Sequence, residues 1–200
     1  DAEPLAPRLA GLTEVVAPCG MAEYVPVHRQ VDVWATNWKL LVENFMDVPH
    51  TVFVHKGWFR NRKRTQVPAT VHRTDGSVLV TYEQENDQLT GAGILMNPGG
   101  EPMKHTDNYY VPNVTRVDYL WGERSGYVIS SQVTPIGPLD SLVYTSIAYR
   151  LPFDLPRNLV ARGVKRFMKW YTTQVIGQDV DIMRVQNEGL SRAPSGLEFQ

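Results

Sequence analysis

Two of the five histidines, His50 and His55, lie close enough in the sequence to share one site. Imidazole nitrogens commonly bind metals, so the pair is a candidate for part of a metal centre. On an ideal helix five residues correspond to a rotation of about 140°, which would place the two rings on different faces. A shared site therefore requires a break in the backbone, and Pro49 favours one, because the residue before a proline avoids the helical conformation. Taken alone, the pair is more simply interpreted as structural or incidental.

A carboxylate far along the chain, Asp179, is the candidate third ligand. It falls within a mostly apolar stripe at helical spacing, which consists of Met168, Thr172, Val175, Ile176, Ile182 and Met183. Asp181 lies about 200° further round the helix and is expected to face solvent. A buried carboxylate needs a partner, which can be a metal ion, an arginine or a backbone donor. Gln186 shares the face of Asp179 and is expected near the ligands.

Two imidazoles and one carboxylate form the ligand set of non-haem Fe(II) oxygenases, which leaves coordination positions open for dioxygen and substrate. We therefore predict that His50, His55 and Asp179 bind a mononuclear Fe(II). Two alternatives stay open. A zinc hydrolase could use the same ligands with Asp47 as general base. A non-catalytic protein that binds a hydrophobic ligand would contain no metal and would hold Asp179 in an ordinary salt bridge.

Asp47, three residues before His50, is a candidate catalytic residue. Its carboxylate is predicted to fix the tautomer of a metal-bound histidine by hydrogen bonding. The alternative is that Asp47 caps the N-terminus of a short helix after Pro49. Asn44, one turn earlier, lies on a similar face, or else is simply helix surface.

The elements that must position these residues are two short helices, a run of strands and a long helix. Residues 37–48 show helical spacing of apolar side chains, and residues 50–55 allow a second short helix. Residues 23–36 and 67–150 are strand-like, with a hairpin around the Thr-Asp-Gly turn at 74–76 and β-rich runs at 92–98 and 108–120. Residues 156–190 are predicted to form one helix. The predicted fold is α+β, a twisted antiparallel sheet packed against a long C-terminal helix.

A pocket for an apolar ligand is expected between such a sheet and helix. The candidates for its lining are Ile94, Met96, Val111, Asn113, Gln132 and Thr134.

The composition is that of an ordinary globular domain, with 200 residues, 42% of them hydrophobic, and a formal net charge of −1. The basic patch at Arg60–Arg64 is too short for a nucleic-acid footprint and is predicted to be a solvated loop. Cys19 is the single cysteine, which excludes an internal disulfide and a cysteine-rich metal site. No apolar run approaches the ~18–20 residues needed to cross a bilayer. We therefore expect a cytoplasmic protein without nucleic-acid or membrane partners.

The segment from Asn37 to His55 closely resembles the iron-site signature of Rieske-type ring-hydroxylating oxygenases. It contains the Asn-Trp-Lys triplet, the Glu-Asn pair, the aspartate and the two histidines at Asn37–Lys39, Glu43–Asn44, Asp47, His50 and His55. The segment from Gln178 to Gln186 is similar to the closing segment of the same family. Gln178 stands where the family usually has a glutamate, a departure that we do not expect to touch the ligand.

This resemblance implies a helix-grip fold of the START-like superfamily, with His50, His55 and Asp179 binding Fe(II). Asp47 would bridge toward the electron donor, a [2Fe–2S] Rieske cluster that is often held by the neighbouring subunit of a trimer. The full-length enzyme would hydroxylate or demethylate a small apolar or aromatic molecule with O₂ and electrons from a ferredoxin or reductase. The Tyr110–Asn113 segment and the Val-Pro pair before His50 favour the monooxygenase and demethylase branch.

A Rieske cluster needs two cysteines and two histidines, and Cys19 begins no such motif. We therefore expect this chain to be a piece of a larger protein that carries the cluster elsewhere. In this interpretation, residues 1–22 are a connector from an N-terminal Rieske domain, residues 23–190 the catalytic domain and residues 191–200 a tail.

Overall fold

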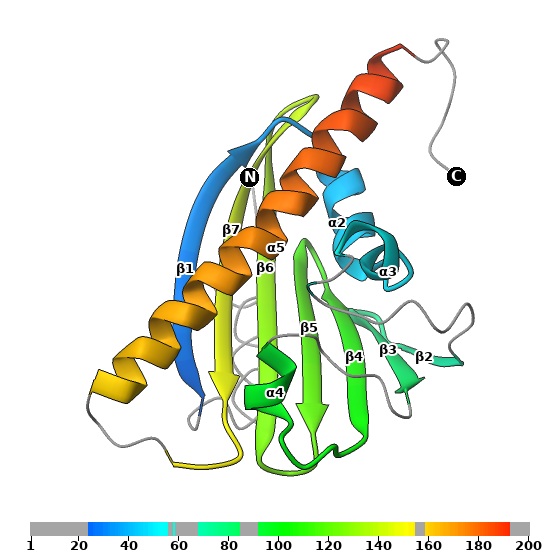
Figure 1. Ribbon diagram of the computed structural model, residues 1–200. Helices are drawn as coiled ribbons and strands as arrows, with labels where there is room; N and C mark the ends of the chain where they lie inside the picture. Colours follow the sequence, from blue (N-terminus) through cyan, green and yellow to red (C-terminus); the bar gives the residue numbers. More distant parts are fainter. Residues whose placement is uncertain (1–23, 56–57, 59–67, 85–91, 155–158, 193–200) are drawn as a thin grey trace, which may run out of the picture.

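The computed structural model describes residues 24–55, 58, 68–84, 92–154 and 159–192 (Figure 1). The predicted α+β architecture is confirmed, because an antiparallel sheet packs against a long C-terminal helix. The elements in chain order are β1 (Val25–Trp34), α2 (Trp38–Met46), α3 (His50–Val54), β2 (Ala69–Arg73), β3 (Ser77–Gln84), α4 (Ala92–Met96), β4 (Met103–Tyr110), β5 (Val114–Trp121), β6 (Ser125–Gly137), β7 (Asp140–Arg150) and α5 (Leu159–Ser191). The predicted connector with Cys19, the Arg60–Arg64 patch and positions 193–200 of the tail lie outside the described residues.

The strands of the described chain form one seven-stranded sheet in the order β1-β7-β6-β5-β4-β3-β2. From β2 to β7 each strand pairs with the next along the chain, so this part is a meander of antiparallel hairpins. The first strand, β1, pairs with the last, β7. This pairing places the start of α2 at the same side of the sheet as α5, as Figure 1 shows.

The hairpin between β2 and β3 forms at the predicted Thr-Asp-Gly turn. The Thr74 Oγ1 accepts hydrogen bonds from the backbone N–H of Gly76, at 3.3 Å, and of Ser77, at 3.0 Å. A threonine at the first position of a turn is favoured because its hydroxyl pairs with these otherwise free amides. The sequence therefore predicted this turn correctly.

Two predicted strand runs are different in the structure. Residues 92–96, which we expected to be extended, form the short helix α4, where the Asn97 N–H donates to the Gly93 carbonyl at 2.7 Å. Met96 is completely buried there, and a short apolar run does not distinguish a buried strand from a buried helix. The run at 108–120 is divided, since β4 ends at Tyr110 and β5 begins at Val114.

The long helix α5 lies across one face of the sheet and confirms the predicted C-terminal helix (Figure 1). Its buried side chains are Met168, Tyr171, Thr172, Val175, Asp179 and Met183. Ile182, which we expected in this stripe, is 39% exposed, because three residues after Asp179 the side chain has turned to the edge of the buried face. Asp181 is exposed, as predicted. No helix in the described ranges is long and apolar enough to span a membrane.

Helix α2 is fixed at its start by contacts with distant segments. The Asn37 Oδ1 accepts from the Lys39 N–H at 2.9 Å as the N-cap, and the Asn37 Nδ2 donates to the Pro138 carbonyl at 2.9 Å. The neighbouring Thr36 Oγ1 donates to the Met183 carbonyl at 3.1 Å, which joins this corner to α5. One asparagine thus satisfies a helix amide and ties the helix to the hairpin between β6 and β7.

Two hydrophobic clusters fill the space between the sheet and α5, and the polar site lies between them. One cluster includes Val175 and extends toward α4. The other includes Met183, Leu40 and Leu41 and is formed with α2. Asp179 is one helical turn from both Val175 and Met183, so its carboxylate interrupts the apolar face of α5 where the two clusters meet.

We predict that Leu41→Ala lowers the free energy of unfolding by about 2–5 kcal/mol, because Leu41 is fully buried and its truncation leaves a cavity under α2. Lys39→Ala on the exposed side of the same helix should change it by less than about 0.5 kcal/mol. Urea unfolding followed by circular dichroism measures both changes. Equal losses in the two variants would contradict the packing of α2 described above.

Candidate metal centre

The backbone breaks between α2 and α3, as the two histidines require. Helix α2 ends at Met46, and Asp47 follows in an extended conformation with φ −95° and ψ 95°. The new helix starts at His50, with Pro49 at its N-cap position. The Thr51 Oγ1 donates to the Val48 carbonyl at 2.7 Å and holds this corner together. The break that we predicted at Pro49 is therefore present, and it begins two residues before the proline.

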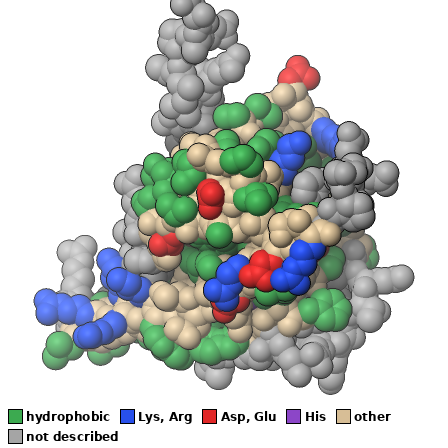
Figure 2. Space-filling model, turned by 90° about the horizontal axis from the view of Figure 1, so that it is seen from above, with side chains coloured by type: hydrophobic (Ala, Val, Ile, Leu, Met, Phe, Trp, Pro, Cys, Tyr) green, Lys and Arg blue, Asp and Glu red, His purple; other side chains and the backbone are tan. Residues whose placement is uncertain are grey.

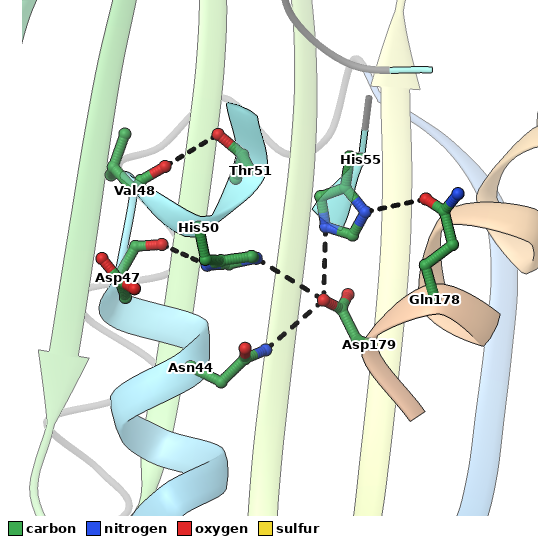
Figure 3. Close-up of polar contacts among 8 residues, drawn as sticks. All are labelled: Asn44, Asp47, Val48, His50, Thr51, His55, Gln178 and Asp179. Carbon is green, nitrogen blue, oxygen red and sulfur yellow. Dashed lines mark hydrogen bonds and ion pairs between the residues drawn. The ribbon is translucent and has the colours of Figure 1, made fainter. Parts of the chain in front are cut away.

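This corner brings both imidazoles to the same carboxylate. The Asp179 Oδ1 lies 3.5 Å from the His50 Nε2 and 3.2 Å from the His55 Nε2. One candidate ligand atom from each residue lies within 4.8 Å of the other two, which is close enough for a single ion to contact all three. Figure 3 shows the two rings from α3 and its C-cap converging on Asp179 of α5. The structure thus brings together the three residues that we selected from the sequence.

Each histidine also has an acceptor on the side away from Asp179. The His50 Nδ1 contacts the backbone carbonyl of Asp47, and the His55 Nδ1 lies 3.0 Å from the Gln178 Oε1 (Figure 3). An Nδ1–H that donates to these oxygens leaves the Nε2 of each ring as the nitrogen that faces Asp179. This is the arrangement in which outer partners fix the tautomer of metal-binding histidines.

The role predicted for the Asp47 side chain needs correction. The contact to His50 comes from the backbone carbonyl of Asp47, while its carboxylate is exposed and points away from the ring (Figure 3). The alternative N-cap role is also wrong, because Asp47 is the C-cap of α2 and α3 has no side-chain cap. Both predictions assumed that the side chain, rather than the peptide group, faces the site.

Two residues close to the ligands were missed or misjudged from the sequence. Asn44 is buried and its Nδ2 lies 3.5 Å from the Asp179 Oδ1, so it is not helix surface. Its position three and four residues after Leu41 and Leu40 places it on the buried stripe of α2, a signal that was available. Gln178 contacts His55, contrary to our expectation that this position does not touch a ligand.

Gln186, which we expected near the ligands, is exposed. It lines a groove between α2 and α5 together with Asp47 and His50. The spacing from Asp179 was correct, but two turns further on, the helix has passed beyond the corner between α2 and α3.

The ionisation of Asp179 reflects these neighbours. Burial by itself would raise the pKa of the Asp179 carboxyl. Hydrogen bonds and charge from His50 and His55 outweigh this effect and hold the pKa below its ordinary value. An ionised carboxylate is the form that binds a cation, so the carboxyl of Asp179 is in the state that a metal ligand requires.

The candidate ligands lie in the wall of a cavity of about 80 Å³ beneath the sheet, where a single water molecule needs roughly 10–15 Å³. The apolar part of the wall includes Val117, Ile129, Val175 and Ile176. The polar part includes Thr145, Thr172, His105 and Asp107.

On the end of the molecule shown in Figure 2, apolar side chains are mixed with charged ones, and no histidine is visible among the described residues.

The pocket residues chosen from the sequence do not form this wall. On β6 the side chains that line the cavity are Tyr127, Ile129 and Ser131, whereas Gln132 is exposed and Thr134 also lies outside the cavity wall. A shift of one residue along a strand exchanges its two faces, which explains this error. Met96 belongs to the hydrophobic core, Val111 is 55% exposed, and Asn113 bonds to the carbonyl of Val133. The side chain of Ile94 lies outside the described residues.

We predict that Gln178→Leu weakens the binding of a divalent transition metal about 10–100-fold, because His55 loses the acceptor that orients its ring. Gln174→Leu, one turn earlier on the exposed side of α5, is the matched control and should bind the metal as the parent does. Anaerobic calorimetry with Co(II) measures the affinity. Unchanged binding by Gln178→Leu would show that the Gln178 contact does not support the ligand.

Comparison with known proteins identifies the family. The family model described as the vanillate O-demethylase oxygenase C-terminal domain matches residues 34–198. No curated protein matches the sequence.

Solved structures show the same fold at low sequence identity. Dicamba monooxygenase bound to 3,6-dichlorosalicylic acid aligns with a TM-score of 0.68 and 12% identity over 89% of this chain and 54% of its own. NdmA of Pseudomonas putida CBB5 with caffeine gives 0.66 and 13%, over 92% and 49%. The quaternary ammonium Rieske monooxygenase CntA gives 0.61 and 17%, over 97% and 48%.

The chain thus spans about half the length of these structures. Its matched segment begins at the end of β1 and includes every candidate ligand. The chain belongs to the vanillate O-demethylase oxygenase C-terminal domain family, the catalytic domains of Rieske-type oxygenases.

Proposed function

We propose that this chain is the catalytic domain of the terminal component of a Rieske-type oxygenase, and that His50, His55 and Asp179 bind one Fe(II). The observation that carries the proposal is the approach of three candidate ligand atoms to within 4.8 Å of one another in the wall of a cavity. Two neutral nitrogens and one carboxylate oxygen suit Fe(II) and leave part of its coordination sphere free. The family assignment supports the same activity.

When bound, the iron supplies the activation of O₂, with electrons from a ferredoxin or reductase. The protein residues prepare the site for it. Gln178 and the Asp47 carbonyl orient the two Nε2 atoms, and Asn44 donates to the Oδ1 of Asp179. Apolar side chains such as Val175 and Ile129 line the cavity and limit the entry of water. The site is therefore organised around three ligands before any substrate enters.

The reaction proposed for the full-length enzyme is hydroxylation or demethylation of a small apolar or aromatic molecule. The relatives were crystallised with a chlorinated salicylate and caffeine, which are compact ring compounds. The mostly apolar cavity is compatible with ligands of this kind. We further propose that the whole protein carries a [2Fe–2S] Rieske cluster outside this chain, forms a homotrimer and works in the cytoplasm.

The alternatives differ in what they require of Asp179 and Asp47. A carrier of hydrophobic ligands needs only a salt bridge at Asp179, whereas here the carboxylate faces two imidazoles and Asn44, and the family consists of oxygenase domains. A zinc hydrolase needs a general base in the site, whereas the Asp47 carboxylate is exposed and turned away from His50 (Figure 3). Zinc-dependent hydrolysis without O₂ consumption would nevertheless favour the hydrolase.

Anaerobic loading with Fe(II), followed by nitric oxide, tests the metal site. The parent chain should give a high-spin iron–nitrosyl EPR signal from about one iron per chain, because the triad leaves positions open. His50→Ala and Asp179→Ala should lose the signal, since each removes a ligand. Asp181→Ala, on the exposed side of the same helix, should keep it. Absence of stoichiometric iron from the folded parent would overturn the oxygenase proposal.

Asp47 is proposed to form the route to the electron donor, because its exposed carboxylate lines the groove between α2 and α5 in which His50 also lies. In the full-length enzyme, Asp47→Ala should leave iron content unchanged and lower turnover about tenfold or more. Glu43→Ala changes another exposed carboxylate of the same groove and should have little effect. A loss of iron in Asp47→Ala would assign it to metal binding instead.

A further inference from the structure

A second polar group lies in the wall of the same cavity, apart from the candidate ligands. His105 and Asp107 belong to β4, and the His105 Nε2 lies 2.8 Å from the Asp107 Oδ1. Their side chains are 1% and 2% exposed, so the pair is shielded from solvent. Both residues line the cavity together with His50, His55 and Asp179. The only group of candidate metal ligands found in the described residues does not include the pair.

The imidazole of His105 is held in a fixed orientation by two aromatic rings. The register of the sheet places Tyr82 of β3 and Tyr119 of β5 on either side of it. Their ring centroids are 4.9 and 4.4 Å from that of His105, and the ring planes are tilted by only 26° and 25°. Stacking on two electron-rich faces stabilises either a neutral or a protonated imidazole. His105 is thus positioned to donate to Asp107.

A buried carboxylate with so few partners is costly for folding. Within the described residues, the Asp107 side chain has one hydrogen bond, in which its Oδ1 accepts from His105. Its neighbours across the sheet are Val80 and Val117, which offer no polar side chain. A carboxylate has about four acceptor sites, and replacing such a buried pair with apolar residues is often neutral or stabilising. Fold stability therefore gives no reason for this pair, whereas ligand recognition does.

We infer that Asp107, oriented by His105, is the polar anchor for the substrate and selects molecules with a hydrogen-bond donor. The inference rests on the proposed function, because it assigns the substrate class of the same cavity. The substrate is a compact apolar or aromatic molecule with a hydroxyl or N–H group that donates to the Asp107 carboxylate. A substrate carboxylate at this position would face a buried carboxylate of the protein and is disfavoured. The cavity is small, at about 80 Å³, which favours a compact ligand.

The experiment compares three probes of similar shape on the metal-free chain, with affinities from calorimetry or ligand-observed NMR. The probes are 4-methylphenol, which has a donor; p-xylene, which has a methyl group in its place; and 4-methylbenzoate, which has a negative charge. The parent should bind 4-methylphenol about tenfold tighter than p-xylene or 4-methylbenzoate, as expected for a hydrogen bond to a charged acceptor. Equal or tighter binding of either other probe, or no binding of 4-methylphenol, would overturn the inference.

Variants then assign the preference to the pair. Asp107→Asn keeps the shape but removes the charge, and the preference for 4-methylphenol over p-xylene should fall to about threefold or less. Lys104→Gln, on the exposed side of β4, should keep the full preference. If a folded Asp107→Asn chain still preferred 4-methylphenol as strongly as the parent does, Asp107 would not be the anchor. If this variant did not fold, the comparison of the three probes on the parent chain would still test the inference. The probe experiment uses the metal-free chain, so its result does not depend on whether the chain binds iron. The EPR experiment tests the iron proposal, and the probe experiment tests the role of Asp107.

Discussion

The interaction on which the site depends is the contact between Asp179 of α5 and the two imidazoles at α3. It joins parts of the chain more than 120 residues apart, as the 123-residue separation between His55 and its partner Gln178 shows. The carboxylate would be costly on the buried face of α5 without these partners. The imidazoles, in turn, converge only because α2 ends before Pro49 and the chain turns at Asp47 and Val48. The polar residues of α3 and α5 therefore determine that these two helices pack next to each other.

The scaffold around this contact keeps the two segments in place. The pairing of β1 with β7 brings the start of α2 next to the β6–β7 hairpin, where Asn37 bonds to the Pro138 carbonyl. Thr36 connects the same corner to the carbonyl of Met183 on α5. Leu40 and Leu41 then fill the core between α2 and that helix. Because these contacts lie on the same helices as Asn44 and Asp179, the hydrophobic packing also sets the geometry of the polar site.

The cavity beside the site combines two environments. Its apolar wall suits a hydrophobic ring, while two separate polar groups, the candidate ligands and the His105–Asp107 pair, occupy other parts of the wall. Tyr127 adds a third polar contact, since its hydroxyl lies 2.6 Å from the Thr172 Oγ1. Burial raises the pKa of Tyr127, and although the bond to Thr172 acts against this, the phenol stays neutral. A cavity of this kind can hold a ring and distinguish it by its substituents.

The sequence by itself determined the α+β class, the hairpin at Thr74, the long C-terminal helix and the three candidate ligands. These features depend on local signals: periodicity, turn residues and unusual polar residues at buried positions. It also determined the break near Pro49, since proline restricts the backbone of its neighbours. His50, His55 and Asp179, which the structure brings together, could be selected from the sequence because few residue types bind metals and the family resemblance covers both segments.

Only the tertiary structure decided which side chains surround those ligands. Gln178 meets His55, and Asn44 meets Asp179, because α5 crosses the corner between α2 and α3, a geometry that no local pattern contains. Asp47 contributes its carbonyl instead of its carboxylate because the backbone is extended there. The cavity wall on β6 follows from the strand register, in which a shift of one residue exposes Gln132 and buries Ser131. Strand faces and helix crossings depend on long-range packing, so the sequence alone could not supply them.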